Sequence, residues 1–292
     1  MHDFDVITPD GRTLSVLESG DPTGKPILMH AGMPNSRLQY GPVVHIAERQ
    51  GVRLISYDRP GYGRSSAQPG RCMASCCDDV RAVAAALEID QLGVWGISAG
   101  GPHALACAAL LEDLVVAVAS LASPAPFDAD GLDYYEGMGE MNVDDIRMSI
   151  EDPVAARAKC EEDRIEYMAT EPDTIVESIS TLVSEVDAAA LTGELAEFYV
   201  ACARDGLAPG SDGWWDDGMA LVTPWGFELD AIRTPVLVRH GRQDRFVPFG
   251  HGEWLARRIP SAQPALSDDD GHLTLVANHI EATHEWLLER MA

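Results

Sequence analysis

A serine stands in a very short turn between a buried strand and a helix. Residues 92–96 form a short continuous apolar run of the kind that buried parallel strands show, and residues 99–111 read as a helix. The turn between them reads Gly-Ile-Ser-Ala-Gly, with Ser98 at its centre. We expect Gly96 and Gly100 to be required, because a Cβ atom at either position would collide with neighbouring backbone. This turn restricts the fold to a parallel sheet whose strands lead into helices.

The same alternation of strand and helix continues on both sides of the serine. Apolar runs typical of strands occur at residues 13–17, 26–30, 52–57, 115–121, 235–240 and 262–266. Patterns typical of helices occur at residues 43–50, 73–87 and 280–291. This order predicts an α/β fold, with a mostly parallel central sheet and helices on both of its faces.

One long segment, residues 127–228, differs from the rest of the chain. It is acidic and mainly helical in pattern, and it carries no strand-like apolar run. Strand character returns abruptly after it, at residue 235. The simplest interpretation is one sheet interrupted by an inserted helical segment. We therefore expect a core of residues 1–126 and 229–292 and a helical cap, or lid, of residues 127–228.

The charge of the chain restricts its partners. The sequence has 21 basic and 47 acidic residues, a formal net charge of −26. Such a surface repels the phosphates of nucleic acids and the headgroups of anionic lipids. We expect a small-molecule substrate and neither nucleic acid nor a membrane as partner. The sequence carries no signal of an oligomeric state.

The sequence also bears on export and on cofactors. The N-terminus is acidic and lacks the apolar run of a secretory signal, and no stretch reaches the roughly 18 apolar residues of a spanning helix. The six cysteines form no CxxC pair and have no histidine at the spacing of metal ligands. These patterns predict a cytoplasmic protein with small buried thiols and with no cofactor or metal.

Several motifs together resemble those of the α/β-hydrolase superfamily, in particular its cap-bearing branch of esterases and proline-iminopeptidase-like enzymes. The Ser98 turn matches the G-x-S-x-G nucleophile elbow. Residues 58–65 are similar to the D-x-x-G-x-G-x-S loop of that family, residues 241–248 to its G-x-x-D-x-x-V-P loop, and residues 270–272 to its late histidine loop. The resemblance covers most of the chain outside the cap and implies the α/β-hydrolase fold.

A serine hydroxyl needs a base to remove its proton, and histidine is suited to this near neutral pH. His272 stands where the family keeps its base, and Asp244 follows the strand of residues 235–240. Ser98, Asp244 and His272 then occur in the chain order of the family's catalytic triad. His240 is a second histidine that could face the site, and Asp128 is a second possible acid. Other neighbours are assigned to packing, the surface or tuning of the base: His103, His251, His279, His284, Asp268, Asp269 and Asp270.

An oxyanion hole in this family combines two backbone N–H groups. One should come from Ala99, directly after the nucleophile. The family pattern for the other is H-G-x-P, where this chain reads Ala-Gly-Met-Pro at residues 31–34. We assign the second donor to the amide of Met33. The histidine of the motif is replaced by Ala31, and His30 stands one residue earlier, so its part in the site is left open.

A serine nucleophile predicts acyl transfer to water, with hydrolysis of a carboxylic ester through an acyl-enzyme. Alternatives on the same scaffold are a proline-iminopeptidase-like aminopeptidase, a cofactor-free C–C hydrolase or lyase, and a ligand receptor that keeps the triad. Glu136 and Glu140 are candidates for binding the amine of a peptide. Apolar side chains of the cap would line the cleft or dock the cap on the core: Tyr134, Tyr135, Met138, Met141, Trp214, Trp215, Trp225 and Phe227.

Overall fold

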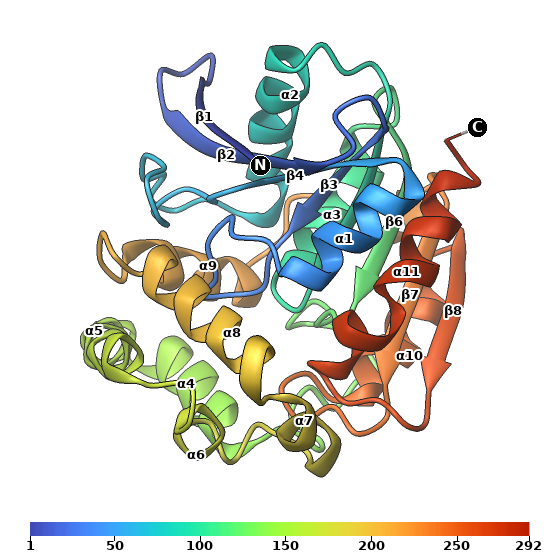
Figure 1. Ribbon diagram of the computed structural model, residues 1–292. Helices are drawn as coiled ribbons and strands as arrows, with labels where there is room; N and C mark the ends of the chain where they lie inside the picture. Colours follow the sequence, from blue (N-terminus) through green and yellow to red (C-terminus); the bar gives the residue numbers. More distant parts are fainter. Residues whose placement is uncertain (292) are drawn as a thin grey trace.

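A single eight-stranded sheet runs through the computed structural model, which describes residues 1–291 (Figure 1). The strand order is β1-β2-β4-β3-β5-β6-β7-β8; the β1–β2 and β2–β4 pairings are antiparallel, and the remaining pairings are parallel. The strands are β1 (His2–Ile7), β2 (Thr13–Gly20), β3 (Lys25–His30), β4 (Val52–Tyr57), β5 (Leu92–Ile97), β6 (Val115–Leu121), β7 (Val236–Gly241) and β8 (Ala262–Ser267).

Helices cover both faces of this sheet. On one face lie α1 (Gly41–Gln50) and α11 (Thr274–Leu288), and on the other lie α2 (Cys76–Ala86), α3 (Gly100–Leu110) and α10 (Phe249–Arg258). Short 3₁₀ turns precede α2 and β7, at η1 (Met73–Ser75) and η2 (Leu229–Ala231). The predicted fold class, a mostly parallel sheet between two layers of helices, is confirmed.

The sheet has a hydrophobic core on each face, because successive side chains of a central strand point to opposite faces. In β5, Val94 packs under α2 and α3, whereas Trp95 and Ile97 pack under α1 and α11. Because both faces are covered, nearly every residue of β5 and β6 is buried. This explains why these strands read as continuous apolar runs rather than as alternating patterns.

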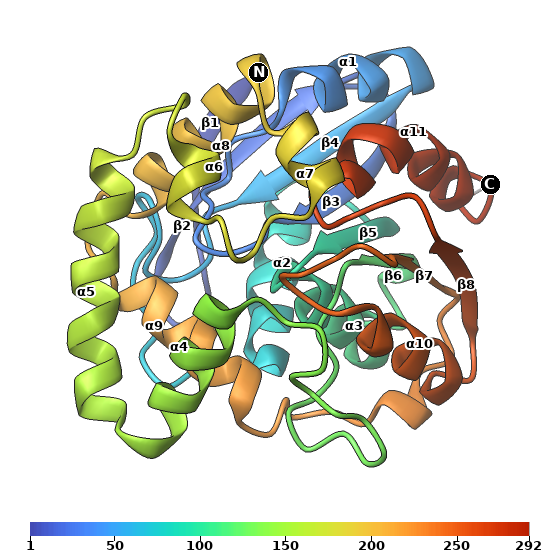
Figure 2. The same ribbon diagram turned by 90° about the horizontal axis from the view of Figure 1, so that it is seen from below.

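Six helices follow β6 before the chain returns to the sheet at β7. Figures 1 and 2 show them together on the side toward which the parallel strands point. They have a small hydrophobic core of their own, which includes Ile179, Leu182 and Leu195, and which Leu273 joins from the opposite side. These helices are α4 (Glu140–Glu151), α5 (Pro153–Ala169), α6 (Ile175–Ser178), α7 (Glu185–Ala190), α8 (Gly193–Gly206) and α9 (Asp212–Val222).

Two elements of the structure, β1 and α10, were not predicted from the sequence. Strand β1 is an edge strand in which only Val6 is buried, so it shows no apolar run. Helix α10 contains Gly250 and Gly252, which weaken the helical signal. Gly252 is needed because a Cβ there would lie 2.5 Å from the Cβ of His240. Helix α11 begins at Thr274, earlier than the expected residue 280.

The close approach at Gly100 gives the first prediction. A Cβ at this position would lie 2.2 Å from the carbonyl oxygen of His30, so Gly100→Ala must push α3 away from β3. We expect a loss of about 1–3 kcal/mol or more in the free energy of unfolding, measured by urea denaturation. Gly218→Ala in α9 is the matched control, because its Cβ would meet no atom within 4 Å. It should stabilise the chain by up to about 1 kcal/mol, and equal stability of the two variants would contradict the account.

Candidate active site

Ser98 occupies a strained turn between β5 and α3. Its φ angle is +56°, a left-handed conformation that non-glycine residues rarely adopt. Two backbone hydrogen bonds hold it there: Ser98 N donates to Leu121 O at 2.9 Å, and Gly101 N donates to Ser98 O at 2.8 Å. Glycine is required at position 96, as expected, because a Cβ there would lie 2.1 Å from the carbonyl oxygen of Gly100. The turn thus projects the serine beyond the sheet, at the N-terminus of α3.

Asp244 and His272 are hydrogen-bonded to each other. The Nδ1–H of His272 donates to Asp244 Oδ2 at 2.8 Å, and both residues are buried. The other carboxylate oxygen of Asp244 accepts hydrogen bonds from Phe246 N at 2.9 Å and Val247 N at 2.8 Å. The ring of Phe246 stacks on the imidazole, with 4.5 Å between centroids. The carboxylate and the stacked ring therefore fix the orientation of the imidazole.

The environment of His272 also sets its protonation. Burial alone would lower the pKa of the imidazole, because it disfavours the charged form. The charge of Asp244 and its hydrogen bond outweigh burial, and the net effect raises the pKa above the usual 6.5. The imidazole can thus accept a proton readily near neutral pH.

A buried carboxylate that sequence reasoning missed holds the histidine loop. Asp187, in α7, is fully buried and accepts hydrogen bonds from the backbone N–H groups of His272 at 2.9 Å, Leu273 at 2.8 Å and Thr274 at 3.3 Å. Ser184 Oγ donates to the same carboxylate at 2.9 Å. The local signal was a serine three residues before an aspartate, which indicates only a helix cap.

The other candidate bases have other hydrogen-bond partners. His240 is fully buried with its Nε2 3.5 Å from Asp244 Oδ2, but its Nε2–H donates to Val247 O at 2.8 Å and it lines neither Ser98 cavity, so it supports the loop that carries Asp244. His103 donates from Nδ1 to Ala99 O, His251 lies between Ala125 and Tyr134, His279 pairs with Asp270, and His284 is buried beside Trp95.

The alternative acids are also occupied or distant. Asp128 is exposed and lines a different surface depression, beside Trp225. Asp270 binds Asn278 and His279, and exposed Asp268 pairs with Arg242, so their carboxylates are engaged away from His272. Asp269 is exposed.

The two backbone segments expected to form an oxyanion hole both lie close to Ser98. Gly32 is so close that a Cβ there would be 3.3 Å from the Cβ of Ser98, and Met33 lines the cavities that Ser98 lines. Ala99, directly after the serine, is the N-cap residue of α3. His30 is buried behind this turn, with Nε2 3.7 Å from Cys107 Sγ, and it does not line either Ser98 cavity.

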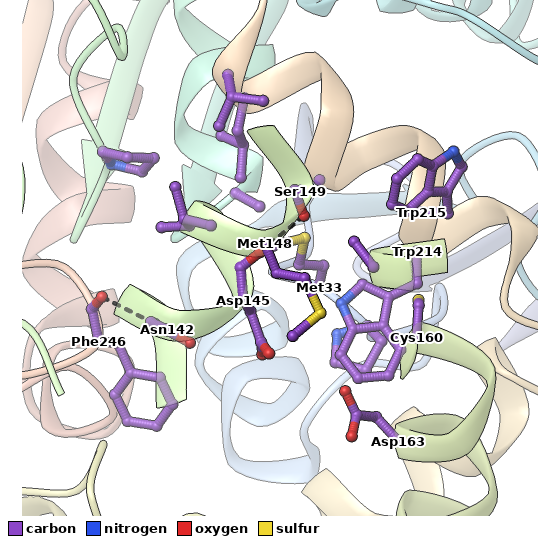
Figure 3. A pocket seen from close by; sticks show the side chains of 18 of the residues that line it. Met33, Asn142, Asp145, Met148, Ser149, Cys160, Asp163, Trp214, Trp215 and Phe246 are labelled. Carbon is purple, nitrogen blue, oxygen red and sulfur yellow. Dashed lines mark hydrogen bonds between the residues drawn. The ribbon is translucent and has the colours of Figure 1, made fainter. Parts of the chain in front are cut away.

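Two cavities meet at Ser98. The larger, about 180 Å³, reaches under α4, α5 and α9 and is lined mainly by apolar side chains, among them Met33, Met138, Met148, Trp214 and Trp215 (Figure 3). The smaller, about 90 Å³, contains His272 and an apolar wall built by α6 and α8. Both volumes suit small organic groups on the two sides of a reacting atom.

The larger cavity also has polar side chains on its wall: Asn142, Asp145, Ser149, Lys159 and Asp163. Lys159 pairs with Asp145 at 3.1 Å and Asp163 at 2.6 Å on its wall. Of the cap side chains named from the sequence, Tyr134 also lines this cavity, whereas Glu136 lies on another surface depression and Glu140 is exposed. Tyr135, Met141, Trp225 and Phe227 lie outside both Ser98 cavities.

Within residues 1–291, one set of side chains has the spacing of metal ligands. The ligand atoms of His30, Cys76 and Cys107 lie within 4.8 Å of one another, and all three residues are buried in the core, outside the Ser98 cavities. Over the same residues, no helix is both long and apolar enough to cross a membrane.

Comparisons with known proteins agree with the observed fold. The family profile described as "alpha/beta hydrolase fold" matches residues 25–140. The chain is 28% identical over 273 residues to the AB hydrolase superfamily protein YisY of Bacillus subtilis, covering 91% of each chain. It is similar in structure to an esterase from Exiguobacterium antarcticum (TM-score 0.70, 20% identity, 100% of both chains) and to a bromoperoxidase from Bacillus anthracis (TM-score 0.71, 22% identity, 99% of both chains). These structural likenesses concern the fold.

The Asp187 contacts predict a loss of stability. In Asp187→Asn, one oxygen that accepts backbone hydrogen bonds becomes an amide that cannot accept them, which leaves buried N–H groups without a partner. We expect a loss of about 1–3 kcal/mol in the free energy of unfolding, measured by urea denaturation. Glu185→Gln, on the exposed side of the same helix, is the control and should change little. If both variants unfold at the same urea concentration as the unchanged chain, Asp187 does not hold the loop.

Proposed function

We propose that this chain, a hydrolase that belongs to the α/β-hydrolase superfamily, cleaves carboxylic esters of small molecules through an acyl-enzyme on Ser98. The observation that carries the proposal is the buried Asp244–His272 hydrogen bond of 2.8 Å beside a cavity that Ser98 shares. A serine in a strained turn, a histidine in the same cavity and a carboxylate on its far nitrogen are the parts that nucleophilic acyl transfer requires.

The reaction begins with proton transfer. The Nδ1–H of His272 is bonded to Asp244, so the neutral ring offers Nε2 as the base that removes the proton from Ser98 Oγ. The oxygen then attacks the carbonyl carbon of the ester. His272 returns the proton to the leaving alcohol, and the acyl group stays on Ser98. A water molecule, activated by the same ring, releases the acid and restores the enzyme.

The negative oxygen of the tetrahedral intermediate needs hydrogen-bond donors. We assign this role to the backbone N–H groups of Met33 and Ala99, two residues that line the larger cavity together with Ser98. The N-terminus of α3 adds a positive partial charge at the same place. Neither donor depends on its side chain, so replacement of the motif histidine by Ala31 does not remove them.

We also propose that residues 127–228 act as a cap on a core of residues 1–126 and 229–292. Helices α4, α5 and α9 supply most of the wall of the larger cavity, and α6 and α8 supply part of the wall of the smaller one. Both walls are mainly apolar, and the chain carries a net charge of −26. The site therefore favours uncharged, apolar acyl and alcohol groups over anionic ones.

An aminopeptidase finds less support. Such an enzyme needs a free carboxylate near the serine to bind the amine, but Glu136 and Glu140 lie outside both cavities. Asp145 and Asp163 do line the larger cavity, and both are already paired with Lys159. C–C bond hydrolysis would use the same triad, so an activity assay with both kinds of substrate distinguishes it from ester hydrolysis.

A screen of p-nitrophenyl esters of increasing acyl length tests the proposed reaction. We expect turnover with an optimum at short acyl chains, because the cavities measure only about 180 and 90 Å³. Ser98→Ala should lower kcat by at least about a thousandfold and abolish labelling by a fluorophosphonate. Proline p-nitroanilide and a vinylogous diketone serve as probes of the alternatives. Labelling that persists in Ser98→Ala would disprove the nucleophile, and diketone cleavage without ester turnover would favour a C–C hydrolase.

The pH dependence of kcat/KM tests the base. His272 must be neutral to accept a proton, and its pKa is raised above 6.5, so activity should fall as pH decreases through a midpoint above 6.5. In Asp244→Asn the charge that raises this pKa is lost, so the midpoint should move to lower pH and kcat should fall by about 10⁴-fold. His279→Gln is the control and should keep the profile, because its ring binds Asp270. A midpoint that stays in place in Asp244→Asn would rule out this pair.

A further inference from the structure

A carboxylate of helix α9 is buried without contributing to the hydrophobic core. Asp217 has no exposed surface. It lies between two buried arginines of the segment that joins β4 to α2, Arg59 and Arg71. Arg59 donates from Nε to Asp217 Oδ2 at 2.8 Å, and Arg71 donates from Nη2 to Asp217 Oδ1 at 2.7 Å. Burial acts to raise the pKa of this carboxyl, but the two guanidinium groups outweigh it and hold the pKa below the usual range. Asp217 is therefore ionised.

Arg59 uses its remaining donors on the turn that carries Met33. Its Nη1 donates to the carbonyl oxygen of Ala31. Its Nη2 lies 2.7 Å from Asp217 Oδ2 and also 3.5 Å from the carbonyl oxygen of Gly32, so one guanidinium group links the carboxylate to the turn. The carbonyl of Gly32 and the N–H of Met33 belong to one planar trans peptide, in which the two groups point in opposite directions. The carbonyl of Gly32 accepts a hydrogen bond from Asn35 N at 3.1 Å and faces Arg59 Nη2 at 3.5 Å, so the N–H of Met33 is directed away from the guanidinium.

The start of α9 also lies in direct backbone contact with the loop that carries Arg59. A Cβ at Gly213 would lie 2.6 Å from the carbonyl carbon of Gly61, and one at Gly61 would lie 2.7 Å from the Cα of Gly213. Arg71 donates from Nη2 to the carbonyl of Gly213 at 2.8 Å. The contact is therefore built for close docking of α9 on the core.

The same helix reaches the substrate cavity. Trp214 and Trp215, which follow Gly213 in α9, line the larger cavity together with Met33 (Figure 3). One helix thus provides the wall of the cavity and the counter-ion of Arg59. A buried guanidinium without its carboxylate would be strongly destabilised, so Arg59 depends on Asp217 for its position.

From these contacts we propose that Arg59, held by Asp217 of α9, is the positioning residue for the Met33 amide, so that the oxyanion hole is complete only when α9 is docked. This inference rests on the proposed function, because it assigns a role within the same reaction. Loss of the pair should weaken stabilisation of the tetrahedral oxyanion while leaving substrate binding and the Ser98–His272 proton transfer in place.

Two variants test the proposal with a matched control. Asp217→Asn removes the charge that holds Arg59, and Arg59→Lys keeps a positive charge near Asp217 but cannot reach both the carboxylate and the Gly32 carbonyl. Asp216→Asn is the control, because Asp216 is the neighbouring carboxylate of α9 and contacts Arg71 at 3.3 Å. Thermal unfolding establishes that each variant is folded. If Asp217→Asn does not fold, Arg59→Lys alone tests the positioning role of Arg59.

The readout must be specific for the oxyanion. A trifluoromethyl ketone forms a tetrahedral adduct with the serine and places an oxyanion in the hole, whereas the matching methyl ketone binds as a ground-state ligand. We expect both variants to lose about 10- to 100-fold in kcat for an ester, with little change in KM, and to lose a similar factor of preference for the trifluoromethyl ketone. Asp216→Asn should stay within about threefold of the unchanged chain.

Different results would overturn the positioning role of Arg59 and the proposed esterase function. Folded Arg59→Lys and Asp217→Asn variants that keep the unchanged kcat and ketone preference would overturn the positioning role and leave the esterase proposal standing. Equal losses in Asp216→Asn would also overturn it, because they would reflect a general effect on α9. If the unchanged chain shows no fluorophosphonate labelling at Ser98, the proposed function itself is wrong, and this inference is overturned with it.

Discussion

The close approach of α3 to the end of β3, made possible by Gly100, is the constraint on which the candidate site depends. A side chain at Gly100 would strike the carbonyl oxygens of His30 and Ala31, so only glycine lets the helix after the serine lie directly against the turn that carries Met33. Ser98, two residues before Gly100, takes a left-handed conformation in the same turn. The nucleophile and the proposed oxyanion donors are therefore adjacent because of backbone packing.

The remaining parts reach this place from separate loops. Asp244 follows β7 and His272 follows β8, two neighbouring strands whose carboxyl ends meet at the same edge of the sheet. Helices from the segment between β6 and β7 then hold both sides of the site: Asp187 binds the backbone of the histidine loop, and Asp217 binds Arg59 beneath the Met33 turn. The segment that would select the substrate is thus also bonded to the loops that would perform the chemistry.

Much of this could be predicted from the sequence, for identifiable reasons. Central strands such as β5 and β6 are buried on both faces and read as apolar runs, and Ser98 stands in a turn that few sequences allow. Asp187 and Asp217 could not be predicted, because a chain with 47 acidic residues gives no local sign of which carboxylates are buried. Their partners lie 85 and 158 residues away in the sequence, at His272 and Arg59. Edge strand β1 was missed because its outward side chains are polar.

The most direct test of the central claim is to trap the acyl-enzyme. The chain is mixed with excess p-nitrophenyl acetate, quenched in acid within the first turnovers, and measured by intact-protein mass spectrometry followed by peptide mapping. The account predicts the mass of one acetyl group on the peptide that contains Ser98, together with a burst of p-nitrophenol equal to the enzyme present. Rapid turnover with no acyl group on Ser98, or with the group on another residue, would contradict it.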